Sequence, residues 1–107
     1  MQMIRMYTGS DGITHLEDIE PSEMKFSAKE IMITSKSPTP FPSPWHTSSA
    51  RQIKMIRTGR VKWEVEDGNT RILGPGDLVM EEDLSGKGHR ALQVDDDPVI
   101  MMAVTLA

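Results

Sequence analysis

The chain has 107 residues, of which 37% are hydrophobic and 26% are charged, and its net charge is -4. This length allows one domain with a single core, and this composition is typical of an ordinary globular protein. An acidic chain without a basic patch argues against nucleic-acid partners, because such binding depends on clustered Lys and Arg side chains. The absence of cysteine excludes disulfides and thiolate chemistry, and it favours a cytoplasmic location.

Nothing in the sequence predicts contact with a membrane. Arg5, Tyr7 and Asp11 interrupt the first residues before the apolar region of a signal peptide can form. The longest apolar run, residues 99–104, is far too short to cross a bilayer and instead predicts a buried strand. We therefore expect a single domain over residues 1–107 with neither nucleic-acid nor membrane partners.

The first third of the chain predicts short strands. Residues 3–7 alternate weakly between apolar and polar side chains, which predicts a first edge strand. Residues 13–19 predict a second strand and residues 31–34 a third. We interpret residues 1–33 as edge strands that precede the main part of the domain. His15 has no motif around it and is interpreted as a surface residue.

Prolines dominate the next segment. Pro38, Pro40, Pro42 and Pro44 occupy every second position. Proline has no N–H to donate to a β-ladder, and its ring holds the chain extended. The sequence therefore predicts a stiff wall or rim here rather than an interior strand.

The central stretch, residues 60–93, predicts a ladder of short antiparallel strands. Val61, Trp63 and Val65 alternate with charged residues, which is the period of a strand with one apolar and one polar face. Turn residues separate the later apolar runs, and a glycine-spaced loop ends at His89. We expect a histidine at the end of a loop to contribute little to the core.

Polar residues that follow the prolines share one parity. In strand geometry, residues of one parity line the same face unless a bulge intervenes. The residues concerned are His46, Ser48, Gln52, Lys54 and Ile56. An inward Lys54 could serve as a base, an anion clamp or an amine nucleophile, whereas a bulge between Ser48 and Gln52 would turn it to solvent. Both orientations stay open.

At this point the chain resembles the cupin family, whose members are small barrels of the jelly-roll kind. Their first motif contains an opening glycine, His-x-His, a glutamate and a closing glycine. The matching positions here are Pro40, His46, Ser48, Gln52 and Gly59, of which His46 and Gly59 fit the motif. The second motif contains an opening glycine, a proline, a histidine and an asparagine. The matching positions are Gly76, Glu82, His89 and Gln93, of which Gly76 and His89 fit.

The resemblance implies an all-β fold, a double-stranded β-helix or jelly-roll cupin barrel, with the motif-bearing barrel over residues 34–107. It also implies a pocket for a small molecule inside that barrel. It does not imply one reaction, because cupins include dioxygenases, isomerases, epimerases, cyclases, decarboxylases, storage proteins and sensor domains.

The departures from the motifs bear on metal binding. A typical cupin site uses three histidines and a carboxylate, whereas the set here would be His46, His89 and the neutral amide of Gln52. Two imidazoles and an amide bring no negative charge and hold a divalent ion poorly. We therefore expect no cofactor. The rival interpretation is iron, zinc, manganese or nickel held by both histidines and an acidic residue from the triplet Glu81, Glu82 and Asp83.

The resemblance and the residue chemistry together suggest a non-redox enzyme acting on a small molecule. His46 and His89 would transfer protons, Gln52 would orient a carbonyl or hydroxyl, and Lys54 or Lys87 would stabilise developing negative charge. Further candidates for ligand contact are Trp45, Ser48, Arg51, Trp63, Glu81 and Lys87. Isomerisation, cyclisation, decarboxylation and dehydration would suit this set. The alternatives are a ligand-binding module without catalysis and a metal-dependent dioxygenase.

A homodimer is the partner that we expect besides a small molecule. The run 99–106 carries apolar side chains at nearly every position and must be covered on both faces. Cupins commonly pair through sheet faces or edges.

Overall fold

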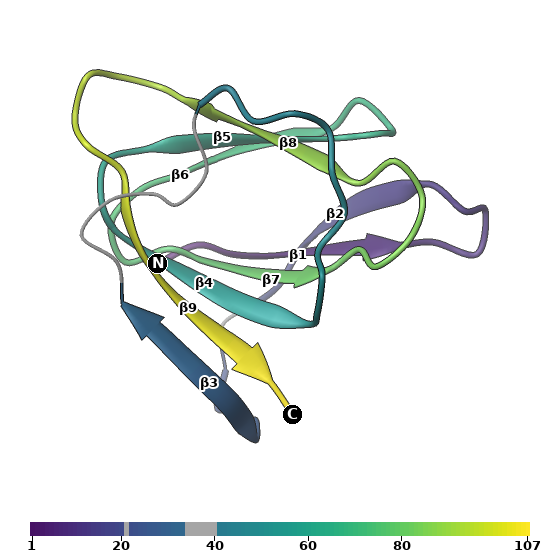
Figure 1. The fold of residues 1–107 in the computed structure, drawn as a ribbon, viewed down its shortest axis with the longest axis horizontal. Coiled ribbons are helices and arrows are strands. Elements are labelled where there is room, and N and C mark those ends of the chain that lie inside the picture. The colour runs from purple at the N-terminus through teal and green to yellow at the C-terminus, as the bar shows by residue number, and fades with distance from the viewer. Residues whose placement is uncertain (21, 34–40) are drawn as a thin grey trace.

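The computed structural model describes residues 1–20, 22–33 and 41–107, and Figure 1 shows their arrangement. The strands are β1 (Met3–Thr8), β2 (Thr14–Asp18), β3 (Ala28–Ile33), β4 (Gln52–Thr58), β5 (Val61–Val65), β6 (Thr70–Leu73), β7 (Leu78–Glu82), β8 (His89–Gln93) and β9 (Ile100–Leu106). These residues contain no helix long and apolar enough to cross a membrane. The all-β class predicted from the sequence is confirmed.

The strands form two sheets that face each other across the core (Figure 1). The larger sheet has the order β2-β1-β7-β4-β9-β3, and the smaller one has the order β6-β5-β8. Neighbouring strands are antiparallel except β1 and β7, which are parallel. The stretch 60–93 is therefore divided between the sheets: β5, β6 and β8 form an antiparallel ladder as predicted, while β7 belongs to the larger sheet.

The first strand is not an edge strand, so that prediction was wrong. β1 lies between β2 and β7, and its Ile4 and Met6 are fully buried. Strand alternation explains this position, because Ile4 and Met6 point into the core while Arg5 stays on the outer face. The edges of the larger sheet are β2 and β3.

The core lies between the two sheets and receives side chains from both. In β5 the residues Val61, Trp63 and Val65 point inward, as their alternation predicted. The apolar side chains that pack together in this core are Ile4, Met6, Ile56, Val61, Trp63, Val65, Leu73, Val79, Ala91, Val99 and Met101. Close packing of this kind fixes the positions of the polar side chains that lie next to it.

The described part of the proline segment runs beside β8. The backbone N–H of Ser43 donates to the Ala91 carbonyl, and the Ser43 Oγ accepts the Ala91 N–H, both at 2.9 Å. Ser43 is not a proline, so it pairs although prolines flank it. Two predicted features, the prolines at 38 and 40 and the last residue of the strand 31–34, lie outside the described residues.

One face of the larger sheet stays open at β3. Ile31 and Ile33 are 61% and 67% exposed, and they lie beside Val104 and Met102 of β9. In β9 the inward Met101 is buried, whereas Met102 and Val104 on the opposite face are half-buried. Among the described residues, the core thus covers one face of the apolar run, while Met102 and Val104 on the other face are covered less completely.

His15 links two hairpins through its ring. Its Nε2 lies 2.8 Å from Asp11 Oδ2, and its Nδ1 lies 2.8 Å from Asp67 Oδ2. The hydrogen bond to Asp11 raises the pKa of His15 most above its ordinary value of 6.5, and the hydrogen bond to Asp67 raises it further, because both carboxylates favour the imidazolium form. Protonated His15 therefore ties the β1–β2 turn to the β5–β6 turn.

This contact should make stability depend on pH near neutrality. Because the pKa of His15 is raised in the folded state, its stabilisation is fully present below pH 6.5 and is lost as the pH rises through the raised value. We expect the wild type to melt at a higher temperature than His15→Gln at about pH 5.5, and the difference to shrink by about pH 9. An equal difference at both pH values would contradict the role of the His15 charge.

Candidate functional site

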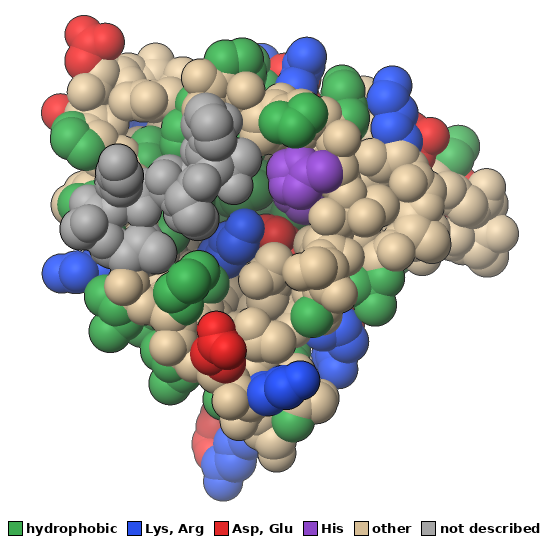
Figure 2. All heavy atoms as spheres, viewed as in Figure 1, with side chains coloured by type: hydrophobic (Ala, Val, Ile, Leu, Met, Phe, Trp, Pro, Cys, Tyr) green, Lys and Arg blue, Asp and Glu red, His purple; other side chains and the backbone are tan. Residues whose placement is uncertain are grey.

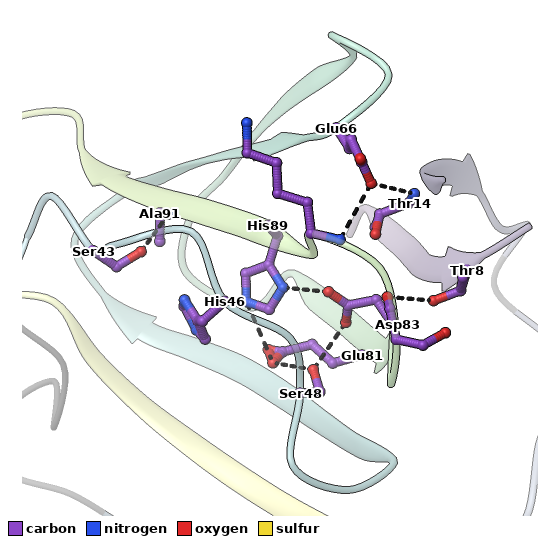
Figure 3. A network of polar contacts seen from close by, with 12 residues as sticks. Thr8, Thr14, Ser43, His46, Ser48, Glu66, Glu81, Asp83, His89 and Ala91 are labelled. Carbon is purple, nitrogen blue, oxygen red and sulfur yellow. Dashed lines mark hydrogen bonds and ion pairs between the residues drawn. The ribbon is translucent and has the colours of Figure 1, made fainter. Parts of the chain in front are cut away.

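Polar side chains gather between the two sheets, next to the apolar core. They are His46, Ser48, Gln52, Lys54, Glu81, Asp83 and His89, and we call them the interior polar cluster. Figure 3 shows the carboxylates of Glu81 and Asp83 between His89 and Ser48. Figure 2 shows a hollow on one face of the molecule in which a histidine, a basic side chain and an acidic side chain lie close together.

His89 is held in one orientation by Asp83. The imidazole is 1% exposed, and its Nδ1 lies 2.6 Å from Asp83 Oδ2. A carboxylate can only accept, so Nδ1 carries the proton and Nε2 of the neutral ring carries the lone pair. Nε2 has no hydrogen-bond partner within the described residues, and Glu81 Oε1 is 3.9 Å away.

This burial corrects one expectation from the sequence. His89 is among the largest fully buried side chains, so it is part of the interior rather than a loop side chain with little influence on the core. It is the first residue of β8, where strand alternation turns it inward together with Ala91. Replacement of His89 by alanine would therefore leave a cavity, and glutamine is the better probe of its chemistry.

Ser48 joins the two buried carboxylates. Its Oγ lies 2.9 Å from Asp83 Oδ1 and 3.2 Å from Glu81 Oε1. The hydroxyl has one proton and can donate to only one of them at a time. The backbone N–H of Ser48 also donates to the Asp83 carbonyl at 3.0 Å, which fixes the loop before β4 against the end of β7.

Lys54 points inward, which answers the question that the sequence left open. Its Nζ lies 3.1 Å from Glu81 Oε2 and 5.9 Å from the centre of the Trp63 ring. The Lys54 side chain is 19% exposed, whereas the Glu81 side chain is 1% exposed. Gln52, two residues earlier in β4, donates from Nε2 to Glu81 Oε1 at 3.2 Å. The parity of β4 therefore holds from Gln52 to Ile56.

His46 reaches the cluster from the rim. It precedes β4 and forms a β-bridge with His89, with backbone N–H to carbonyl distances of 3.0 and 2.9 Å. The two ring centroids are 4.4 Å apart. The His46 Nδ1 lies 2.8 Å from the Pro44 carbonyl oxygen, which can only accept, so its Nε2 also keeps the lone pair.

Two residues expected near the site lie on the outer face of the larger sheet. Glu82 Oε1 lies 2.6 Å from Arg5 Nε, and its Oε2 lies 2.7 Å from Arg51 Nε. Burial alone would raise the pKa of Glu82, but the hydrogen bonds from Arg5 and Arg51 outweigh it and lower that pKa. Glu82 and Arg51 point away from the interior because they alternate with the inward Glu81 and Gln52.

Two other candidates, Trp45 and Lys87, lie outside the cluster. The Trp45 ring packs against Lys87 Nζ at 4.8 Å and Arg90 Cζ at 5.2 Å from its centre. Arg90 follows the inward His89 in β8, so this stack lies on the outer side of the smaller sheet. Trp63 is the tryptophan beside the cluster, with its ring centroid 5.6 Å from that of His89.

The carboxylates of the cluster are already engaged by protein groups. Glu81 contacts Lys54, and Asp83 contacts His89. The described residues contain no group of three or more His, Asp or Glu side chains arranged to hold a metal ion. Of the cluster's ligand-type atoms, His89 Nε2 and Glu81 Oε2 have no hydrogen-bond partner among the described residues, and Glu81 Oε2 already lies 3.1 Å from the Lys54 ammonium.

Sequence reasoning named Asp83 as a possible metal ligand and missed its contact with His89. The signal was parity, since Asp83 follows β7 two residues after the inward Glu81, and Glu82 between them points outward. No family model matches the chain, and no curated protein matches it either.

Proposed function

We propose that this chain is a cupin-type jelly-roll barrel, built as a double-stranded β-helix, whose interior polar cluster performs non-redox acid–base chemistry on a small molecule. Two facing sheets support the fold. The contact between His46 and His89 supports the family, because these are the histidines at its two motif positions.

The observation that carries the proposed chemistry is the pair formed by His89 and Asp83. Asp83 fixes the ring and the tautomer of His89, which leaves the buried Nε2 free to take a proton. A positioned general base of this kind contributes about a hundredfold to ten-thousandfold in rate. The buried carboxylate also stabilises the imidazolium that forms.

The remaining members of the cluster have complementary roles. Lys54 contacts Glu81, which lies 3.9 Å from His89, and its ammonium group stabilises negative charge that develops on a substrate oxygen. Gln52 orients a carbonyl or hydroxyl group, and His46 supplies a second imidazole at 4.4 Å for return of the proton. Isomerisation, cyclisation, decarboxylation and dehydration are reactions that suit this combination.

Proton exchange with solvent tests this function without knowledge of the natural substrate. The protein is incubated in D2O with a panel of small ketones, aldehydes and hydroxy acids, and deuterium at carbon is measured by NMR and mass spectrometry. We expect at least one compound to exchange faster with protein than without it. His89→Gln should slow this exchange by about a hundredfold or more, because it removes the base.

His15→Gln is the matched control, because it removes a histidine outside the cluster and should leave the exchange rate unchanged. Exchange that survives His89→Gln would contradict the proposed role of His89. Saturable binding without exchange would favour the ligand-binding module. Near-stoichiometric metal bound through both histidines, with activity lost on chelation, would favour the metal-dependent reaction.

We propose further that the chain forms a homodimer through the open face at β3 and β9. The exposed Ile31 and Ile33 and the half-buried Met102 and Val104 form the apolar surface that a second copy would cover. Analytical ultracentrifugation should show a dimer that Ile33→Lys converts to monomer. A wild-type species of only 12.0 kDa in dilute solution would contradict this dimer.

A further inference from the structure

Three buried polar atoms in or beside the cluster have no hydrogen-bond partner among the described residues: Nε1 of Trp63, Nε2 of His89 and Oε2 of Glu81. The Glu81 oxygen lies 3.1 Å from Lys54 Nζ, so its charge is compensated. The Trp63 and His89 atoms have no such neighbour in the cluster, and their side chains are 2% and 1% exposed. The two rings meet edge to face, with 5.6 Å between their centroids. A buried indole N–H usually donates to a partner, so an unpaired one in a ring that packs against the ring of an unpaired imidazole marks a place for a ligand atom.

The two atoms have opposite hydrogen-bonding character. The indole N–H of Trp63 can only donate. The His89 Nε2 accepts, because Asp83 holds the ring proton on Nδ1. A ligand that satisfies both has an acceptor oxygen next to a removable proton. A carbonyl group with a hydrogen on its α-carbon has this arrangement.

The surrounding charges bear on whether the ligand can be an anion. Glu81 and Asp83 place two carboxylates in the cluster, at 1% and 0% exposure. Among the described lysines and arginines, Lys54 is the one that contacts these carboxylates, and Glu81 already pairs with it at 3.1 Å. An anionic ligand would add negative charge to a buried region that holds no spare cation, which is strongly unfavourable.

Building on the function proposed above, we propose that the interior polar cluster selects an uncharged carbonyl compound over a carboxylic acid. The carbonyl oxygen accepts from Trp63 Nε1, and the α-carbon faces His89 Nε2. His89 takes the α-proton, the C–H electron pair becomes the carbon–carbon double bond, and the carbonyl π pair moves to oxygen as an enolate. Trp63 donates to that oxygen until a proton returns from an imidazole to carbon.

The indole signals report directly on this contact. The chain has two tryptophans, so its ¹H–¹⁵N spectrum contains two indole N–H signals, and Trp45→Phe assigns them. The probes are matched pairs at millimolar concentration: hydroxyacetone against pyruvate, and acetamide against acetate. We expect each uncharged probe to shift the Trp63 signal downfield in a saturable way, with at least about tenfold tighter binding than its charged counterpart. The Trp45 signal should not move.

A change of charge tests the basis of the selection. Glu81→Gln removes one carboxylate and frees Lys54, so acetate binding should tighten by about tenfold or more. Glu82→Gln is the matched control, because the neighbouring side chain lies on the outer face and should leave acetate binding unchanged. Equal or tighter binding of anions by the wild type, or no shift of the Trp63 signal by any uncharged probe, would overturn the assignment.

The outcomes also separate this inference from the function on which it rests. Saturable shifts from uncharged probes without deuterium exchange would support the ligand class and reject catalysis. Deuterium exchange confined to carboxylate anions would support catalysis and reject the ligand class.

Discussion

Gly88→Ala should lower the free energy of unfolding by about 3 to 5 kcal/mol, which is at the upper end for a single substitution. A Cβ at this position would overlap the carbonyl group of His46 and would lie 2.8 Å from the Thr47 nitrogen. The β-bridge between His46 and His89 would have to move to make room. Gly88 also has φ of +84°, a conformation that costs an L-residue about 1 to 2 kcal/mol.

Gly76→Ala is the matched control, because Gly76 has nearly the same φ, +86°, but no atom within 4 Å of an added Cβ. We expect Gly76→Ala to cost only about 1 to 2 kcal/mol, so that the difference between the variants measures the overlap with His46. Urea denaturation analysed by linear extrapolation gives both values. Equal losses of unfolding free energy in the two variants would show that the His46 backbone does not lie this close to Gly88.

Lys54→Met should destabilise the protein by about 3 kcal/mol, because it leaves the Glu81 carboxylate buried without its cation. Glu81 would keep its hydrogen bonds from Ser48 and Gln52, which is why the expected loss is at the lower end of the range for a broken buried pair. Arg51→Met removes a cation from Glu82 on the outer face and should cost less than about 1 kcal/mol, since Arg5 remains.

A double-mutant cycle distinguishes the lost charge pair from lost packing. Lys54→Met combined with Glu81→Gln removes both charges, and most of the stability lost in Lys54→Met should return. If the double variant is instead as unstable as the sum of the single variants, the two side chains do not interact. Thermal and urea denaturation at one pH would supply the four free energies.

Local periodicity predicted the strands and much of the interior. The alternation of Val61, Trp63 and Val65 was enough to assign the inner face of β5, because one side of that strand must be buried. The same reasoning left Lys54 open between an inward and an outward orientation, and only the register of β4, which has no irregularity before Ile56, shows that it points inward. These features depend on neighbours in the sequence.

Other features depend on contacts that no local pattern contains. The parity argument extended β4 back to His46, yet His46 and Ser48 lie in a loop and reach the cluster through contacts with β8 and β7. The parallel contact of β1 with β7 likewise joins segments with no common local signal. The outward positions of Trp45 and Lys87 follow from packing against Arg90, which the motif resemblance could not show.

The span of chain between the members of the interior polar cluster has a kinetic consequence. Ser48 and Asp83 are 35 residues apart in the sequence. On the outer face of the larger sheet, the contacting residues Arg5 and Glu82 are 77 apart. Contacts between residues so far apart in the sequence require closure of long loops before they contribute any free energy, so they form slowly in folding. Asp83 and His89 can therefore meet Ser48 and His46 only when the two sheets are nearly complete. The proton exchange proposed above would then appear only with the native state, and neither half of the chain alone would show part of that activity.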